Sequence, residues 1–251
     1  FGWRAAFLVL ASLIGIGLAT TLFLAREPLA PGTPTPAAWG ARLRLAVVDP
    51  FRDMLTRPGW PLILGFVALY KLGEALAGIM TAPFYRALGF SRLDVAAVSG
   101  VFGLVATLAG VALGGVLVAG IGVGRALLVT GVGQMLSNLM YVALSEAGHS
   151  VPMLWAQVGV ENTTDGLADA AFVAYLSGLT STAFTATQYA LLSSLAAVPL
   201  RTLGATSGYL AEAMGWTPFF LMTTAAALPG MALMLALLRR FPPRENGDDP
   251  R

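Results

Sequence analysis

The 251-residue sequence contains no cysteine and a single histidine, and only 11% of its residues are charged. Without cysteine, the chain has neither a disulfide framework nor a thiolate metal site. The one histidine, His149, has no cluster of ligand residues around it in the sequence, so we expect no metal site. The net charge of +2 is too small to indicate nucleic-acid binding.

Signature motifs of several enzyme classes are also missing. The sequence contains no Walker loop, no nucleophile elbow and no HExxH pattern. We therefore expect a protein that is not an enzyme, binds no organic cofactor and does not hydrolyse ATP within this chain.

Apolar residues dominate the composition that remains. They make up 57% of the chain, and the mean hydropathy is +0.75, whereas a soluble domain carries about 25% charged residues. These values predict an all-α, polytopic membrane protein, because backbone groups in lipid must be hydrogen-bonded within helices. Seven stretches are long enough to cross a bilayer. They are Arg4–Ala25, Trp60–Phe84, Leu93–Ala119, Arg125–Glu146, Val151–Gly178, Ala186–Ala213 and Trp216–Leu238.

Arginine placement predicts the orientation of these spans. Basic residues gather in a proline-rich linker, residues 26–59, and at the C-terminal end of the chain. Six spans separate the two groups, so both lie on one side, and the excess of arginine indicates the cytoplasm. The arginines concerned are Arg26, Arg42, Arg44, Arg52, Arg57, Arg239, Arg240, Arg244 and Arg251.

The stretch Val151–Gly178 is long enough to span the membrane yet carries three acidic residues, Glu161, Asp165 and Asp169. Their i, i+4 spacing places them on one helix face. Asp165 falls roughly 20 Å along the span, inside a hydrocarbon layer of about 30 Å. A charge at that depth costs at least about 3 kcal/mol, so the face must meet protein or water. We interpret it as lining a substrate or proton path. The alternative is an amphipathic surface helix over residues 151–169.

Two further spans carry buried charges. Lys71 and Glu74, at i, i+3, are expected to pair along their helix or to answer a carboxylate of the acidic span. Arg201 follows the helix breaker Pro199 and needs an anionic partner such as Asp165, unless the span breaks there and the guanidinium reaches water. Two polar residues of the fourth span are expected to make interhelical hydrogen bonds rather than to bind a ligand. These are Gln134 and Asn138.

A weak internal repeat predicts the domain organisation. The sequence FGWR opens the first span and MGWT opens the last, and both spans end at basic, proline-containing exits. The repeat brackets six spans, which is typical of facilitator transporters built from two six-helix halves. We therefore expect residues 1–25 to be the last helix of a first half and residues 26–59 a cytoplasmic linker. Residues 60–240 would then be the second six-helix bundle and residues 241–251 a cytoplasmic tail.

Two stretches resemble a known family. YKLGEALAGIMTAPFYRALGF, from Tyr70, and NTTDGLADAAFVAYLSGLTSTAFTATQYALLSSL, from Asn162, resemble the AmpG-type muropeptide permeases of the major facilitator superfamily. The resemblance extends from Trp60 to Leu238. It implies proton-driven import of cell-wall muropeptides (GlcNAc-anhydro-MurNAc peptides) across the bacterial inner membrane for peptidoglycan recycling. The expected partners are this small-molecule substrate, the lipid bilayer and the missing N-terminal half of the same transporter.

These interpretations give an expected set of site residues. Asp165, Asp169 and Glu161 are assigned to proton coupling, with protons as the coupling ion. Substrate binding or counter-charge is assigned to a second set: Lys71, Glu74, Arg201, Gln188, Tyr189 and Asn162. Three alternatives remain open, namely a facilitator for another organic anion such as acetyl-CoA, a non-transporting sensor on the same scaffold, and an intramembrane enzyme such as a lipid-modifying transferase.

Overall fold

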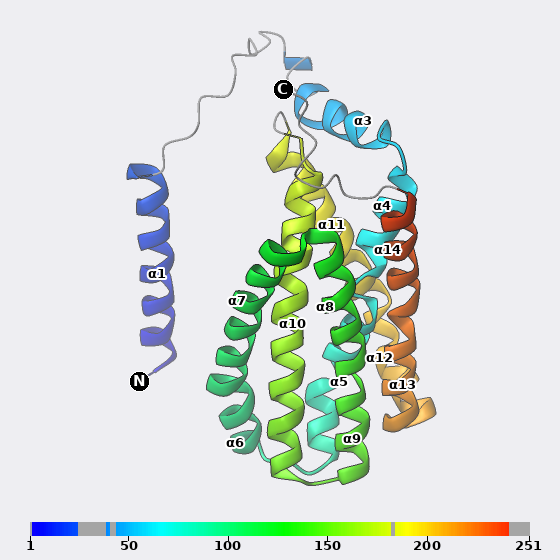
Figure 1. Ribbon diagram of the computed structural model, residues 1–251. Helices are drawn as coiled ribbons and strands as arrows, with labels where there is room; N and C mark the ends of the chain where they lie inside the picture. The colour runs from blue at the N-terminus through cyan, green and yellow to red at the C-terminus, as the bar shows by residue number, and fades with distance from the viewer. Residues whose placement is uncertain (1, 25–38, 41–43, 182–183, 241–251) are drawn as a thin grey trace. The chain divides into compact units, whose positions relative to one another are not determined.

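The computed structural model describes residues 2–24, 39–40, 44–181 and 184–240, and the regular structure in these ranges is helical (Figure 1). Residues 25–38 and 41–43 of the expected linker and the expected tail, 241–251, lie outside the described residues. The chain divides into two compact units, Phe1–Arg42 and Leu43–Arg251. The all-α class predicted from the sequence is confirmed.

The first unit contains α1, Trp3–Phe23, a helix of 21 residues with a mean hydropathy of 2.2. Its side chains are apolar on every face and almost all are exposed. A helix that is apolar all round requires lipid or other helices around it. The helix matches the first predicted span, Arg4–Ala25, to within two residues at each end.

The second unit begins with a short π-helical turn, Arg44–Val48, followed by α3, Asp49–Leu55. The helices that follow form a bundle (Figure 1). They are α4, Trp60–Leu69; α5, Leu72–Ala87; α6, Arg92–Val95; α7, Gly103–Ile121; α8, Val123–Ser137; α9, Leu139–Ala147; α10, Val151–Leu179; α11, Thr185–Thr202; α12, Ser207–Met214; α13, Trp216–Ala226; and α14, Leu228–Arg240. A π-helical turn, Ala96–Phe102, joins α6 to α7, and a 3-10 turn, Gly204–Thr206, joins α11 to α12.

Five helical segments in the described residues are long and apolar enough to cross a membrane. They are Trp3–Phe23, Trp60–Ala87, Arg92–Ile121, Val123–Ala147 and Trp216–Arg240. The two other predicted spans are helical but are not among these five: α10 carries the three carboxylates, and the stretch after α11 is interrupted by the 3-10 turn. Their membrane crossing stays a prediction. In the bundle, α10 packs along α7 and α8 (Figure 1), which argues against a surface helix over 151–169.

Glycines allow the helices around α10 to approach closely. A Cβ atom on Gly114 of α7 would lie 2.7 Å from the backbone oxygen of Leu167 in α10. Gly110 of α7 and Gly166 of α10 each face backbone atoms of the other helix at even shorter range. Backbones pack this tightly only where side chains are absent, so α7 and α10 form one closely fitted pair.

Two of the spans are broken in the middle, and the breaks lie against each other. The helix pair α4 and α5 is interrupted at Tyr70 and Lys71, and the pair α13 and α14 at Ala227. A Cβ atom on Gly230 would lie 2.7 Å from the Leu69 backbone oxygen, and one on Gly73 would lie 2.5 Å from that of Thr223. These contacts fix the position of Lys71 inside the bundle.

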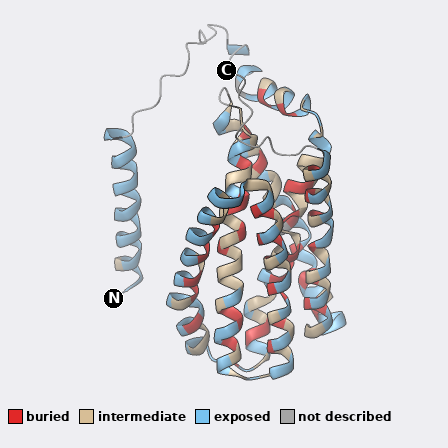
Figure 2. Ribbon diagram, viewed as in Figure 1, coloured by how far each residue is buried: buried red, intermediate tan, exposed pale blue. Residues whose placement is uncertain are grey.

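The core of the second unit consists of two buried apolar clusters that contain several aromatic side chains. Figure 2 shows the buried positions distributed along the helices of the bundle. In the first cluster the rings of Tyr70 and Phe172 stack at 5.2 Å, and in the second those of Tyr141 and Phe220 stack at 4.6 Å. Tyr70 belongs to the first cluster and Ala77 to the second. Lys71 and Glu74, which lie between these two residues in the sequence, are therefore placed between two apolar regions.

Candidate functional site

Lys71 lies at the centre of an ion-pair network that joins α5 to α10. Lys71 is the residue immediately before α5, with φ −97° and ψ 15°, so its side chain projects from the break between α4 and α5. Its Nζ atom lies 3.0 Å from Glu74 Oε2 and 3.3 Å from Asp165 Oδ1, and it also pairs with Asp169. Lys71 therefore makes both of the expected kinds of ion pair, one with Glu74 at i+3 and others with the carboxylates of α10.

The helical spacing of α10 explains why one lysine reaches two of its carboxylates. Asp165 and Asp169 are four residues apart and project from the same face. Glu161, one turn earlier, does not join the lysine but accepts a hydrogen bond from Ser137 of α8, with an Oγ–Oε2 distance of 3.2 Å. The predicted acidic face of α10 thus meets protein on two sides, α5 and α8.

The network holds more negative than positive charge. When all four groups are ionised, one ammonium faces three carboxylates, Glu74, Asp165 and Asp169. The side chains of Lys71, Glu74 and Asp165 are about a quarter exposed, while that of Asp169 is 44% exposed. Partly buried like charges repel strongly. Such a group favours binding of a proton or another cation.

A cavity of about 460 Å³ opens beside this network, between α5, α10 and α11. Lys71, Glu74 and Asp169 form its charged end. The rest of its lining is mainly apolar and includes the aromatic residues Phe172 and Tyr189. A cavity of this size with a few polar groups at one end is typical of a small-molecule site.

A second polar cluster lies near Glu161 and was missed by sequence reasoning. The Tyr85 hydroxyl donates to Gln157 Oε1 at 2.5 Å, and the hydroxyls of Thr81 and Tyr141 are hydrogen-bonded at 2.9 Å. These residues belong to α5, α9 and α10. Each is an ordinary residue in an apolar span, and only the tertiary packing brings them together.

The structure places Gln188 at a different site from the cavity. Its side chain is fully buried, and Nε2 donates to the Pro50 backbone oxygen at 3.1 Å and to Asp53 Oδ2 at 2.7 Å. Its Oε1 accepts from the Ser181 backbone nitrogen at 2.8 Å. Gln188 therefore ties α11 to the linker helix α3 and to the segment before α11.

Arg57 completes this contact at the end of α3. Its Nη2 lies 2.6 Å from Asp53 Oδ2, and its Nη1 donates to the backbone oxygen of Leu179, the last residue of α10. Hydrogen bonds from Gln188 and Arg57 hold the pKa of Asp53 below its ordinary value of 3.8. We call Asp53, Arg57 and Gln188 the α3 clasp.

The other expected site residues have separate positions. Tyr189 lines the cavity. Asn162 donates to the Val158 backbone oxygen and accepts from Thr107 Oγ1 at 3.0 Å, so it links α10 to α7. Arg201 is exposed near the end of α11, which continues through Pro199, and it forms no ion pair with a described residue.

Comparison with known proteins shows which proteins the chain is similar to. No family model matches the sequence. The anhydromuropeptide permease of Escherichia coli (strain K12) is 40% identical over 235 residues, which is 93% of this chain and 47% of that protein. The chain is a homologue of the AmpG-type permeases. It spans about half the length of the curated relatives it matches.

Other relatives agree with this placement. The putative transporter AmpG 4 of Rickettsia felis is 33% identical over 195 residues, which is 78% of this chain and 47% of that protein. A Haemophilus influenzae protein named only as uncharacterized is 32% identical over 241 residues, or 92% of this chain and 56% of that protein. The Escherichia coli and Rickettsia felis relatives are named as a permease and a transporter, not as enzymes, which agrees with the expectation of a protein that is not an enzyme.

Proposed function

We propose that the chain forms the second half of a proton-coupled facilitator that imports muropeptides across the bacterial inner membrane. Residues 60–240 are its C-terminal six-helix bundle, and residues 1–25 are the last helix of the first half. The linker, 26–59, and the tail, 241–251, lie in the cytoplasm. The kinship with an anhydromuropeptide permease supports the substrate, and the pattern of two six-helix halves supports the architecture.

One observation carries the mechanism: a single lysine pairs with two carboxylates of α10 at the end of a 460 Å³ cavity. A proton that binds Asp165 removes its negative charge and weakens its attraction to Lys71. Lys71 then keeps Glu74 and Asp169 as partners. Loading and release of the proton would thus change the contacts between α5 and α10.

The remaining acidic residues extend this path. Asp169 is the more exposed of the two α10 partners and lines the cavity itself. Glu161 lies one turn beyond Asp165 and is hydrogen-bonded to Ser137. We assign proton handling first to Asp165 and then to Asp169 and Glu161.

The substrate occupies the same cavity. Its charged end offers Lys71 and Glu74 to carboxylate, hydroxyl or amide groups, and Tyr189 offers an aromatic face to a sugar ring. Gln188 and Asn162 contact other helices instead. We therefore assign substrate contact to the cavity residues and helix positioning to those two.

Uptake of labelled anhydromuropeptide by the full-length protein, in cells that lack their own permease, tests the proposal. We expect uptake that a protonophore abolishes. Asp165→Asn should reduce proton-driven uptake at least tenfold at normal membrane levels, whereas Glu212→Gln, at an exposed position of α12, should not. Wild-type uptake by Asp165→Asn would refute the assignment of the proton site. If wild-type protein in the membrane gives no uptake, the substrate is wrong, and organic anions such as acyl-CoA are tested next. Binding without flux would indicate a sensor.

A further inference from the structure

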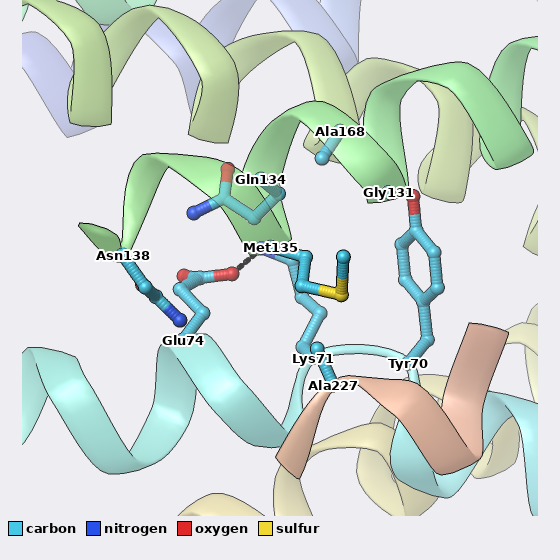
Figure 3. A pocket seen from close by; sticks show the side chains of 9 residues that line it. All are labelled: Tyr70, Lys71, Glu74, Gly131, Gln134, Met135, Asn138, Ala168 and Ala227. Atoms are coloured by element: carbon cyan, nitrogen blue, oxygen red, sulfur yellow. Dashed lines mark ion pairs between the residues drawn. The ribbon is translucent and has the colours of Figure 1, made fainter. Parts of the chain in front are cut away.

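Two buried amide side chains, Gln134 and Asn138, lie beside Glu74 and Lys71 and have polar atoms without hydrogen-bond partners among the described residues. Gln134 is 8% exposed, and neither its Oε1 nor its Nε2 is bonded; Asn138 is 1% exposed, and its Oδ1 is not bonded. Glu74 Oε2 lies 3.0 Å from Lys71 Nζ and is closed off from solvent on this side. Figure 3 shows Gln134 of α8, and Asn138 between α8 and α9, directed toward the Glu74 carboxylate of α5.

The sequence predicts interhelical hydrogen bonds for Gln134 and Asn138, and the described residues do not provide them. A buried amide left unbonded loses its hydrogen bonds to water without replacement, which destabilises the fold. Native proteins rarely tolerate several such groups together without a bound partner. The positions therefore call for a ligand between α5 and α8.

The two amides and the Glu74 carboxylate line a small cavity that is separate from the 460 Å³ cavity. Its volume is about 10 Å³, close to the space that one ordered water requires. Met135, Gly131 and Ala168 form the apolar part of its wall (Figure 3). A site of this size takes a water molecule or a single ion and excludes any organic ligand.

The chemistry of the wall distinguishes water from a cation. Gln134 presents both a donor and an acceptor, and this holds whichever way its amide is oriented. A sodium ion accepts no hydrogen bond from Nε2, whereas water both donates and accepts. The Lys71 ammonium lies 3.0 Å from Glu74 Oε2, so that oxygen already has one positively charged neighbour, and a water molecule can donate a hydrogen bond to it from another direction.

We propose that this cavity binds one ordered water molecule, which donates to the Glu74 carboxylate and bridges it to the side-chain amides of Gln134 and Asn138. The water connects α5 to α8 at the level of the Lys71 network. Ser137, next to Asn138, donates to Glu161, so α8 contacts carboxylates on both of its neighbours.

The bridge fixes the role of Glu74. Held from the α8 side, Glu74 stays beside Lys71 when the α10 carboxylates change charge. It acts as the constant partner of the lysine, and Asp165 and Asp169 act as the exchangeable ones. This role rests on the proposed function, whereas the presence of the water does not.

A cryo-EM map of the full-length protein that resolves ordered waters is the direct test. We expect a density peak within hydrogen-bonding distance of Gln134 and Asn138 in the wild type. A map of that quality without the peak would overturn the proposal.

Infrared difference spectroscopy in H2 16O and H2 18O identifies the molecule. We expect a water O–H band that shifts with 18O, and its loss in Gln134→Met and in Asn138→Leu. Met135→Leu, which changes an apolar residue of the same wall, keeps the band. An 18O-sensitive band that is identical in all four proteins contradicts the proposal.

Thermal unfolding of the purified protein in sodium, potassium and choline chloride tests the competing ion. We expect equal unfolding temperatures in the three salts. If the unfolding temperature is higher in sodium chloride alone, and this increase is lost in Gln134→Met, the cavity binds a cation and not water. If the water is present but muropeptide uptake fails, the proposed function is wrong and the water site stands.

Discussion

The side-chain amide of Gln188 donates to the carboxylate of Asp53 at 2.7 Å, across a sequence separation of 135 residues. This bond fastens the linker helix α3 to the start of α11, and Arg57 fastens the same carboxylate to the end of α10. Two parts of the chain that are distant in the sequence, α3 and the junction of α10 with α11, thus meet at one acidic side chain. The stability of that meeting point depends on the charge of Asp53.

The α3 clasp predicts a dependence of stability on pH. The pKa of Asp53 is lowered in the folded protein, so its ionised form stabilises folding at pH values above the unfolded pKa of about 3.9. That contribution is lost as the pH falls through the lower, folded pKa. We expect wild type to unfold at a higher temperature than Asp53→Asn between pH 7 and pH 5, and the difference to shrink below about pH 4.

Thermal unfolding in detergent across this pH range measures the effect. Asp49→Asn is the control, because Asp49 lies on the same helix with a 3.6 Å ion pair to Arg44 and outside the clasp. A difference between wild type and Asp53→Asn that stays unchanged to the lowest pH would contradict the prediction.

The charge balance around Lys71 predicts a large effect of its removal. Lys71→Met leaves Glu74, Asp165 and Asp169 without their shared cation. Loss of one partner from a buried ion pair costs about 3–5 kcal/mol, and the partial exposure of these side chains favours the lower end of that range. We expect less folded protein in the membrane, measured by size-exclusion chromatography of the detergent-extracted protein.

A compensating substitution checks the cause of that loss. Removing one carboxylate in Lys71→Met/Asp169→Leu lowers the repulsion, so the double variant should be more abundant than Lys71→Met alone. If the double variant is weaker by the sum of both single effects, the residues do not interact as described.

The close packing of α7 on α10 predicts opposite outcomes for two adjacent glycines. A Cβ atom on Gly114 would lie 2.7 Å from the Leu167 backbone oxygen, whereas one on Gly115 meets nothing within 4 Å. Gly114→Ala should therefore destabilise the protein by about 1–3 kcal/mol through overpacking. Gly115→Ala should leave it unchanged or slightly more stable. The unfolding temperatures of the two variants provide the comparison, and equal temperatures would refute the packing.

The cavity predicts a similar contrast between two adjacent serines of α11. Ser193 lines the 460 Å³ cavity, while Ser194 is exposed. Ser193→Trp fills part of the cavity and should reduce uptake of labelled muropeptide at least tenfold, with the protein still folded. Ser194→Trp should retain uptake. Substrate binding elsewhere would leave both variants active.

Much of the fold follows from the sequence because length and hydropathy dictate helices in lipid. The fifth span is predicted at Val151–Gly178 and observed as α10, Val151–Leu179. The i, i+4 spacing of its carboxylates places them on one face without any tertiary information. A buried lysine and a row of buried acids require partners, which is why the pairing of Lys71 with α10 can be anticipated.

Contacts made by uncharged polar residues could not be anticipated in the same way. Gln188 has four possible hydrogen-bonding sites and no charge that demands a particular partner, so nothing local indicates Asp53. The same holds for Tyr85 and Gln157. The break at Lys71 is also invisible locally, because Gly73 suits a continuous helix packed closely against a neighbour as well as it suits an interrupted one.

The interruption between α4 and α5 has a mechanical consequence. A continuous helix bows along its whole length, whereas two short rods joined at a break tilt about that joint. Gly73 and Gly230 keep the joint pressed against the matching interruption between α13 and α14. Lys71 is one of the two residues of this joint, so its ion pairs act at the point about which α4 and α5 tilt. We expect a change in the charges that pair with Lys71 to alter the angle between α4 and α5.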